Sequence, residues 1–345
     1  MNQYPEEILN EKQLEMLLSR PTEATVDMFK EMDGDIIFLG IAGKIGPSLA
    51  QMAKRACYMA GVSKRIIGVS RFSNQDEQAY IAGMGIETIK GDLLDETFLG
   101  GLPKVKNVFF LAGMKFGSED NLSLTWAMNS YLPGLVVRHF KDSRIVAYST
   151  GCVYPLVPIR SGGSRENDRP EAVGEYAQSC LGRERMFEYG SKTNNTPVAL
   201  IRLNYAVEPR YGVLVDIATK VKENRSVDLS MGHFNAIWQG DANNMVLRSL
   251  AQTSVPANII NITGKETLSV RNVVAKFAQV FGVVPLLEGK EADTALLSNP
   301  DKSHELFGAP EVPIDKVIVW TAHWMDSDKK TLGKPTHFEV RDGKY

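Results

Sequence analysis

The chain of 345 residues carries a formal net charge of -2, with 43% hydrophobic and 23% charged residues. This composition is typical of a globular protein with one large two-lobed unit or two domains, and the near balance of charge argues against nucleic acid as a partner. No apolar run reaches the ~18 residues of a membrane helix, and the N-terminus lacks the basic flank and apolar core of a signal peptide, so we expect a cytoplasmic protein without a membrane partner. The 3 cysteines lack C-x-x-C spacing and the 5 histidines are scattered, which predicts neither a disulfide framework nor a metal site.

Residues 1–32 precede the first predicted strand and have the spacing of helices. Leu14, Leu17 and Leu18 share one helical face, and apolar residues recur at every third position from Val26 to Met32. We predict a helical extension that packs on the main domain, and a dimer contact is the alternative.

A short apolar strand leads into a glycine-rich turn and a helix in the segment DIIFLGIAGKIG. Gly40 permits a tight turn, Gly43 lets the backbone approach a pyrophosphate, and Gly46 allows close packing of helix on strand. Lys44 and Ile45 complete the turn at the helix end, where unpaired amides favour an anion. Because the spacing is G-x-x-G-x-x-G rather than G-x-G-x-x-G, a plain strand-to-helix connection is the alternative.

The second predicted strand, residues 65–70, bears on the choice of cofactor. An acid at its end would bind the ribose 2′-hydroxyl of NAD, whereas an arginine there would pair with the 2′-phosphate of NADP. The chain has no acid at this point, and Arg71 follows Ser70. We therefore expect NADP rather than NAD, with a solvated surface arginine as the alternative.

Further strands are predicted over residues 86–89, 105–111 and 145–149, each separated from the next by a helical segment. Strands that alternate with helices form a parallel sheet, and ligands bind at the carboxyl ends of such strands. We expect the small and polar residues that follow the third and fourth strands to contact the cofactor: Asp92, Leu93, Leu111, Ala112 and Gly113.

These segments, in this order, resemble the extended short-chain dehydrogenase/reductases of the NAD-dependent epimerase/dehydratase family. The resemblance rests on GIAGKIG, GDLLD, FFLAG, Asn129, YSTGCVYP, Tyr176 and IRLN, and it covers about residues 33–325. It implies an α/β fold, a Rossmann-type doubly wound parallel sheet with a smaller C-terminal substrate lobe, and a homodimer. On this basis we divide the chain into an N-terminal helical extension (1–32), a cofactor domain (33–204 plus about 235–262), a substrate lobe (205–234 and 263–325) and a tail (326–345).

The resemblance assigns catalytic roles to two residues. Thr150 matches the hydroxyl group that orients the substrate, and Tyr176 matches the tyrosine that acts as general acid and base; Asn129 and Ser149 fall at cofactor-side positions. In the family, a lysine four residues after the tyrosine favours the phenolate and holds the nicotinamide ribose, but this chain has Cys180 there. Since a phenol has a pKa near ~10, loss of that cation should weaken ordinary redox catalysis.

Three explanations for Cys180 are open. Another cation could substitute, and Lys115 after the fourth strand is the candidate, with a solvated lysine as the alternative. A thiolate of Cys152 or Cys180 could act as base or nucleophile, with two small buried hydrophobes as the alternative. The third explanation is a protein that binds nucleotide without turnover.

Departures from the family pattern constrain the substrate. Gly151 and Cys152 stand where dehydratases have acids after the threonine, which disfavours elimination of water. Phe234 stands where many nucleotide-sugar enzymes have an arginine that grips a diphosphate, and Glu208 adds a carboxylate near the expected pocket. We therefore expect a free sugar, a sugar acid or another polyol, unless another basic residue binds an anion instead.

Four residues are candidate substrate contacts: Cys152, Asn204, Tyr205 and Trp238. For the two aromatic residues, a place in the core is the alternative. The favoured function is an NAD(P)-dependent oxidoreductase or epimerase that acts on a carbohydrate-like alcohol by hydride transfer, and the rival is a nucleotide-binding sensor or regulatory protein. The tail ends in the alternating THFEVRD, which predicts a strand with Phe338 and Val340 on one face.

Overall fold

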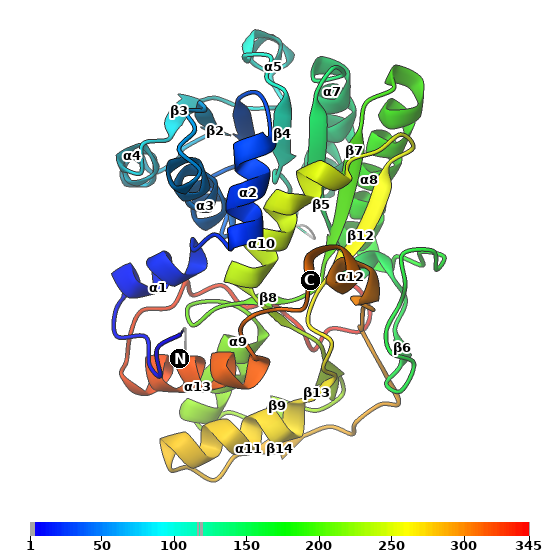
Figure 1. Cartoon of the computed structure of the whole chain (residues 1–345). Helices are drawn as coiled ribbons and strands as arrows, with labels where there is room; N and C mark the ends of the chain where they lie inside the picture. The colour runs from blue at the N-terminus through cyan, green and yellow to red at the C-terminus, as the bar shows by residue number, and fades with distance from the viewer. Residues whose placement is uncertain (1–3, 116, 118–119, 345) are drawn as a thin grey trace.

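A seven-stranded parallel sheet forms the centre of the computed structural model, which describes residues 4–115, 117 and 120–344 (Figure 1). Its strand order is β12-β7-β5-β4-β1-β2-β3. The strands are β1 (Ile36–Leu39), β2 (Ile66–Ser70), β3 (Glu87–Lys90), β4 (Asn107–Phe110), β5 (Arg144–Thr150), β7 (Val198–Leu203) and β12 (Asn258–Ile262). The order reverses between β1 and β4, and at such a switch point the strand ends open into a crevice. The predicted Rossmann-type sheet is confirmed.

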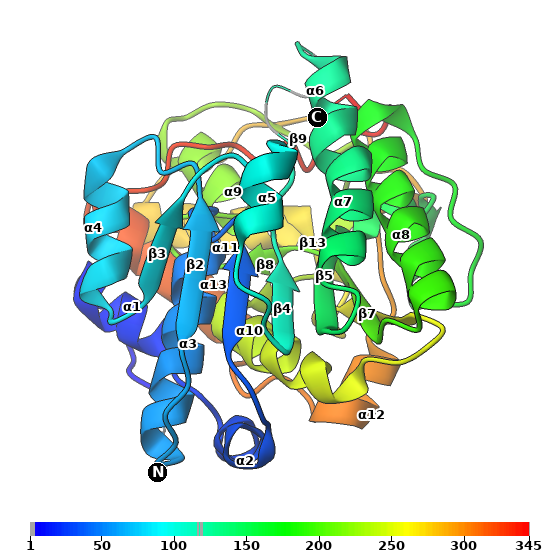
Figure 2. The ribbon, with the colours of Figure 1, turned by 90° about the horizontal axis from the view of Figure 1, so that it is seen from above.

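Helices cover both faces of this sheet (Figure 2). One face is covered by α2 (Glu23–Glu31), α3 (Gly46–Met59) and α10 (Gln239–Arg248), which contact one another. The other face carries α5 (Glu96–Gly101), α7 (Leu132–His139) and α8 (Gly174–Asn194), while α4 (Gln75–Gly83) contacts the edge strand β3. The segment before α7 consists of α6 (Leu122–Trp126) and the π-helical turn η1 (Ala127–Tyr131). Burial on both faces explains why β1 is apolar throughout and why β4 is apolar from Val108 to Phe110.

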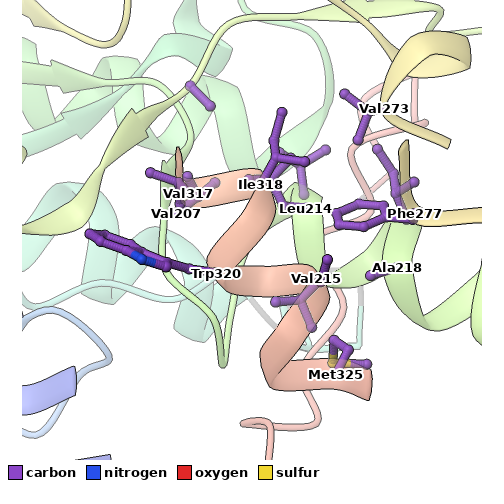
Figure 3. Packing of buried hydrophobic residues seen from close by; sticks show 14 of the residues in the cluster. Val207, Leu214, Val215, Ala218, Val273, Phe277, Val317, Ile318, Trp320 and Met325 are labelled. Atoms are coloured by element: carbon purple, nitrogen blue, oxygen red, sulfur yellow. The ribbon is translucent and has the colours of Figure 1, made fainter. Parts of the chain in front are cut away.

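The C-terminal lobe has its own hydrophobic core (Figure 3). Its helices are α9 (Val213–Lys222), α11 (Val270–Phe281) and α13 (Ile314–Asp326), and α12 (Asp301–Phe307) lies against β12. Short strand pairs complete it: β6 (Val157–Pro158) with β15 (Thr294–Ala295), β8 (Ala206–Val207) with β11 (Ile237–Trp238), β9 (Val227–Asp228) with β14 (Leu287–Glu288), and β10 (His233–Phe234) with β13 (Leu268–Ser269).

The N-terminal extension is helical, as its periodicity predicts, and it connects the two cores. Leu14 and Leu18 of α1 (Glu11–Leu18) are buried in the core of the C-terminal lobe. Phe29 of α2 is buried in the core under the sheet. A role of this extension in a dimer stays a prediction.

The strand predicted in the tail is wrong. Residues 327–344, named here the C-terminal tail, are irregular, and Phe338 is buried while Val340 is only partly buried. The tail bonds to other segments at separate points, such as the Asp216 carboxylate and the carbonyls of Arg210 and Thr294, and does not pair residue by residue with a strand, so the alternating pattern has no sheet to join. His337 also takes a positive φ of 57°, which interrupts an extended course.

Within the described residues, no helix has the length and apolar character to cross a membrane. The same residues contain no cluster of three or more His, Cys, Asp or Glu side chains that could hold a metal ion.

A buried ion pair joins α8 to the sheet. The carboxylate of Glu184 accepts hydrogen bonds from Arg202 Nε at 2.9 Å and Nη2 at 2.7 Å, and both side chains are at most 1% exposed. Glu184 also accepts a bond of 2.5 Å from Ser149 Oγ at the end of β5, and Arg202 Nη1 donates to the Tyr154 hydroxyl at 2.7 Å. The pair therefore fixes α8 against β5 and β7.

We expect Glu184→Gln to lower the free energy of unfolding by about 3–5 kcal/mol, because it leaves the Arg202 charge buried without its counter-charge. Glu188→Gln is the matched control: Glu188 pairs with Arg185 at 2.7 Å near the surface, and its loss should cost about 0–1 kcal/mol. Urea denaturation followed by circular dichroism measures both. Equal stability of the two variants would show that the buried pair does not fix α8.

Candidate active site

A cavity of about 760 Å³ lies along the carboxyl ends of the strands, and we call it the main cavity. Its walls come from the glycine turn after β1, the ends of β4 and β5, α8, the segment before α9 and the C-terminal tail. A second cavity of about 400 Å³, the side cavity, lies over the ends of β1, β2 and β3. Both are lined by residues 42–43, 71, 77, 111, 113 and 334, so they form one continuous site at the switch point.

Each of the three glycines in the turn is required, or favoured, for a different geometric reason. Gly40 has φ +90°, and a Cβ there would lie 2.6 Å from the backbone nitrogen of Ala112. A Cβ on Gly46 would lie 2.0 Å from the carbonyl oxygen of Ile41, so close packing of α3 requires glycine. Gly43 has open space on its Cβ side apart from one contact at 3.5 Å, and it lines both cavities. The turn therefore offers an exposed backbone cradle at the N-terminus of α3, which suits a pyrophosphate.

Lys44 and Ile45 of the turn also line the main cavity. The Lys44 ammonium lies 3.4 Å from the ring centroid of Tyr211. Burial, with Lys115 and Lys334 nearby, lowers the pKa of Lys44 to about 7. An anionic group in the cavity would restore the charged form and be attracted by it.

The predicted cofactor residues at the ends of β2, β3 and β4 come together around the side cavity. Arg71, Asp92, Leu93, Ala112 and Gly113 all line it, and Leu111 faces both cavities. The sequence analysis finds no acid at the end of β2, but the structure brings Glu77 from the first turn of α4 into the walls of both cavities, which Arg71 also lines.

Tyr176 is in the first turn of α8 and lines the main cavity, where its side chain is hydrogen-bonded to that of Thr150. Thr150 ends β5, and its Oγ1 also accepts a bond of 3.1 Å from the Cys152 amide. Burial raises the pKa of Tyr176 well above its usual value, and Cys180 and Cys152 raise it further. Arg183 and the bond to Thr150 lower it.

Cys180 lies one turn after Tyr176 and is fully buried. Burial raises the pKa of its thiol to about 11, so the neutral thiol dominates at pH 7. This state is unfavourable for a thiolate base or nucleophile. Cys152 is partly exposed and lies close enough to affect the pKa of Tyr176.

Arg183 is a candidate functional residue that the sequence analysis misses. It follows Tyr176 by seven positions, two helical turns, so it lies on the same face of α8 and lines the main cavity. Its Nη1 donates to the carbonyl of Tyr148 at 2.9 Å and its Nη2 to Asn129 Oδ1 at 2.6 Å. Its buried Nε has no hydrogen-bond partner among the described residues. The i, i+7 spacing is the sequence signal that could have found this residue.

Asn129 and Gly113 hold Arg183 in place. Asn129 is buried, accepts from the Met114 amide at 2.9 Å and donates to Ser179 Oγ at 3.0 Å, so it joins the loop after β4 to α8. A Cβ on Gly113 would lie 2.4 Å from Arg183 Nη2, so a larger residue there would displace the guanidinium from its bonds to Tyr148 and Asn129.

Lys115, the substitute cation proposed from the sequence, also lies near the tyrosine. Its ammonium is 5.7 Å from the ring centroid of Tyr176 and donates to the carbonyl of Thr336 at 3.0 Å. The site therefore has two cations close to Tyr176, and Arg183 is the one held by β5 and Asn129.

Known proteins were compared with this chain by sequence and by fold. No protein-family model and no curated protein matches the sequence. Among solved structures, the chain is similar to the UDP-glucuronic acid 4-epimerase from Bacillus cereus in complex with NAD, with TM-score 0.70 and 17% identity over 86% of this chain and 100% of that one. It is also similar to DesIV, a dTDP-glucose 4,6-dehydratase from Streptomyces venezuelae, with TM-score 0.71 and 18% identity over 85% and 97%.

The chain has the fold of the extended short-chain dehydrogenase/reductases.

Within this fold, the predicted substrate contacts separate into two groups. Cys152 and Asn204 lie near Thr150 and Gly151, with Asn204 buried and bonded to Asn235 Oδ1 at 2.8 Å. Trp238 is 2% exposed and packs against Trp320 with ring centroids 5.2 Å apart, and Tyr205 packs against Phe234 at 6.3 Å. Packing of both aromatic rings favours the core alternative for them.

The other departures from the extended short-chain dehydrogenase/reductase pattern also have structural explanations. Glu208 is buried and paired with Arg210 at 3.0 Å, and Arg210 pairs with Glu15 of α1 at 2.7 Å. The Glu208 carboxylate therefore belongs to an internal ion pair, and the other two members, Arg210 and Glu15, line the main cavity. Phe234 is fully buried and contacts Phe338 of the C-terminal tail, with centroids 6.3 Å apart.

We expect iodoacetamide at pH 8 to alkylate Cys152 in the native protein and to leave Cys57 and Cys180 unmodified. Cys57 and Cys180 are buried, and with a pKa of about 11 only about one thousandth of Cys180 is thiolate at that pH. Peptide mapping by mass spectrometry gives the three rates, and denatured protein is the control in which all three react. Alkylation of Cys180 as fast as Cys152 would instead indicate a reactive thiolate.

Proposed function

We propose that the protein is a nicotinamide-dinucleotide-dependent oxidoreductase or epimerase that acts on a hydroxyl or carbonyl group of a carbohydrate-like substrate. The observation that carries this proposal is the hydrogen-bonded pair of Tyr176 and Thr150 in the wall of the main cavity, with the guanidinium of Arg183 on the same helix face. The similar epimerase and dehydratase were solved with NAD bound, which supports the same class of cofactor here.

The residues of the two cavities fit such a cofactor. The glycine turn, with Gly43 open to the cavity and Lys44 beside it, would hold the pyrophosphate. Asp92 and Leu93 would contact the adenosine half, and Ser149 and Gly113 the nicotinamide half. When bound, the cofactor supplies the acceptor or donor of a hydride.

Thr150 and Tyr176 would handle the proton of the same reaction. The Thr150 hydroxyl orients the substrate oxygen, and the Tyr176 oxygen takes the hydroxyl proton when the alcohol is oxidised and returns it when the carbonyl is reduced. Both side chains come from regular elements, the end of β5 and the first turn of α8, which keeps the two oxygens at a fixed position relative to each other.

Arg183 would provide the positive charge that the family takes from a lysine at the position of Cys180. Its guanidinium is permanently charged and lowers the pKa of Tyr176 against the effect of burial. The buried Nε offers one further donor, which a hydroxyl group of the bound cofactor or substrate could accept. In this proposal Cys180 contributes packing and a hydrogen bond with Tyr176 rather than a thiolate.

The rival function is a sensor that binds the dinucleotide without turnover. The observation that favours it is the fully buried Cys180 beside Tyr176, which raises the tyrosine pKa further. Tight cofactor binding with no change in reduced-cofactor fluorescence under any polyol or sugar acid would favour the sensor. A substrate-dependent change would favour the enzyme.

Tyr176→Phe should reduce turnover by a factor of about 100 or more while cofactor affinity stays within about threefold, because only the proton exchange is lost.

Arg183→Gln should move the pH at which the rate reaches half its maximum upward by about one unit, since the cation that lowers the Tyr176 pKa is gone. Reduced-cofactor fluorescence gives the rates, and calorimetry gives the affinity.

Arg185→Gln is the control for this experiment, since Arg185 lies on the same helix but is exposed and pairs with Glu188. Arg183→Lys should retain part of the wild-type pH profile. Unchanged turnover in Tyr176→Phe would refute the role of the tyrosine. Identical pH profiles of the Arg183→Gln and Arg185→Gln variants would refute that of the arginine.

We also propose a preference for NADP over NAD, which rests on Arg71 in the wall of both cavities. Arg71→Ala should weaken NADP binding by about tenfold or more and leave NAD binding within about threefold, because a charge-assisted hydrogen bond is worth about 1.5–3 kcal/mol. Calorimetric titration with both cofactors measures this, with the exposed Arg138→Ala as control. Preference for NAD, weakened by Glu77→Gln, would assign the ribose contact to Glu77 instead.

A further inference from the structure

Part of the C-terminal tail lines the main cavity, and the course of the tail can be followed in red in Figures 1 and 2. After α13, the Leu332 amide donates to the carbonyl of Arg210 at 2.9 Å. Leu332 and Lys334 then line the main cavity, and Lys334 lines the side cavity as well. The tail is therefore a wall of the site.

The next part of the tail contacts both Lys115, near Tyr176, and α9 of the C-terminal lobe. Thr336 is 3% exposed, its carbonyl accepts from Lys115 Nζ at 3.0 Å, and its amide donates to Asp216 Oδ2 at 2.7 Å. Lys115 lies beside Tyr176, and Asp216 is in the first turn of α9. Thr336 thus occupies the space between the tyrosine and α9.

Beyond Thr336 the tail is anchored at four further points. Glu339 pairs with Lys220 at 3.0 Å, and Phe338 is buried in the core of the C-terminal lobe. Arg341 donates to the carbonyl of Ser230 at 3.0 Å and to the carbonyl of Thr294 at 2.9 Å. A Cβ on Gly174, at the start of α8, would lie 2.2 Å from the carbonyl oxygen of Gly343. Both lobes and the tyrosine-bearing helix therefore hold the tail.

The tail also ends the main cavity on the side of the C-terminal lobe. That lobe contributes Arg210 and Tyr211 to the lining, whereas the side chains of Asp216 and Lys220 on α9 bond to the tail. A substrate that extends from Tyr176 across α9 would have to take the place of residues 336–339.

We propose that the C-terminal tail determines substrate size by excluding nucleotide-linked sugars and leaving room for a small polyol or sugar acid. The inference rests on the proposed function and names its substrate class. Cations close to Tyr176, Lys115 and Arg183, suit a substrate that carries a carboxylate. Phe234, which takes the position of an arginine in the family pattern, is buried against Phe338 and offers no contact to a diphosphate.

The test compares intact protein with two proteins whose tail is released. One lacks residues 335–345. The other is Lys220→Met/Arg341→Met, which removes the anchors to Glu339, Ser230 and Thr294 but keeps Phe338. Trypsin cleavage after Lys329 and Lys330 reports release of the tail, and thermal unfolding reports that the rest is folded. Each protein, loaded with NADP, is titrated with UDP-glucuronic acid and with glucuronic acid in a calorimeter.

We expect at least tenfold tighter binding of UDP-glucuronic acid by the tail-released proteins than by the intact protein, and no gain for glucuronic acid. Equal affinity of intact and released proteins for UDP-glucuronic acid would overturn the proposal, whether both bind it or neither does. The NADP titration that precedes each measurement separates this result from the proposed function. If neither NADP nor NAD binds the intact protein, the function fails; if one of them binds and the sugar titrations made with that cofactor are equal, only the role of the tail fails.

Discussion

The buried pair of Glu184 and Arg202 is the constraint on which the site depends. Two opposite charges without solvent are stable only when their hydrogen bonds are complete, and here Ser149, Tyr154 and the two charged groups complete them. The bonds run from the end of β5 through α8 to β7, and the Tyr154 hydroxyl extends them to Asn261 on β12 at 2.9 Å. Any tilt of α8 would break several of these bonds at once, so the pair also sets the position of Tyr176.

Two arginines contact or belong to α8, and their guanidinium groups have different surroundings. Arg202 comes from β7 and neutralises a buried acid, whereas Arg183 comes from α8 itself and keeps its charge directed to the cavity. An arginine suits the second position because its planar group can bond Tyr148 and Asn129 and still present a further N–H. A lysine at position 180 would reach the cavity from one turn after the tyrosine, and Arg183 reaches it from two turns. The longer side chain compensates for the greater distance along the helix.

The sheet, the glycine turn and the N-terminal helices could be predicted from the sequence because their signals are local and periodic. The apolar run of β4 and the glycines before α3 each depend on neighbours in the chain. Thr150 and Tyr176 could be found only through the family resemblance, since neither has a local signal of its own. Glu77 and the C-terminal tail could not be found, because their places depend on contacts between distant segments. Lys115 and Thr336, for example, are 221 positions apart.

That separation has a consequence for how the protein is made. Residues 35–203 contain six of the seven sheet strands and every residue of the Tyr176, Thr150 and Arg183 group, so they leave the ribosome well before the tail. Until residues 332–343 are synthesised, the main cavity lacks the lining that Leu332 and Lys334 provide, and Asp216 and Lys220 have not met their partners in the tail. Contacts over such long sequence distances also form late because closing the loop costs entropy first. The site of the nascent chain is therefore more open to solvent than that of the folded protein until the tail docks.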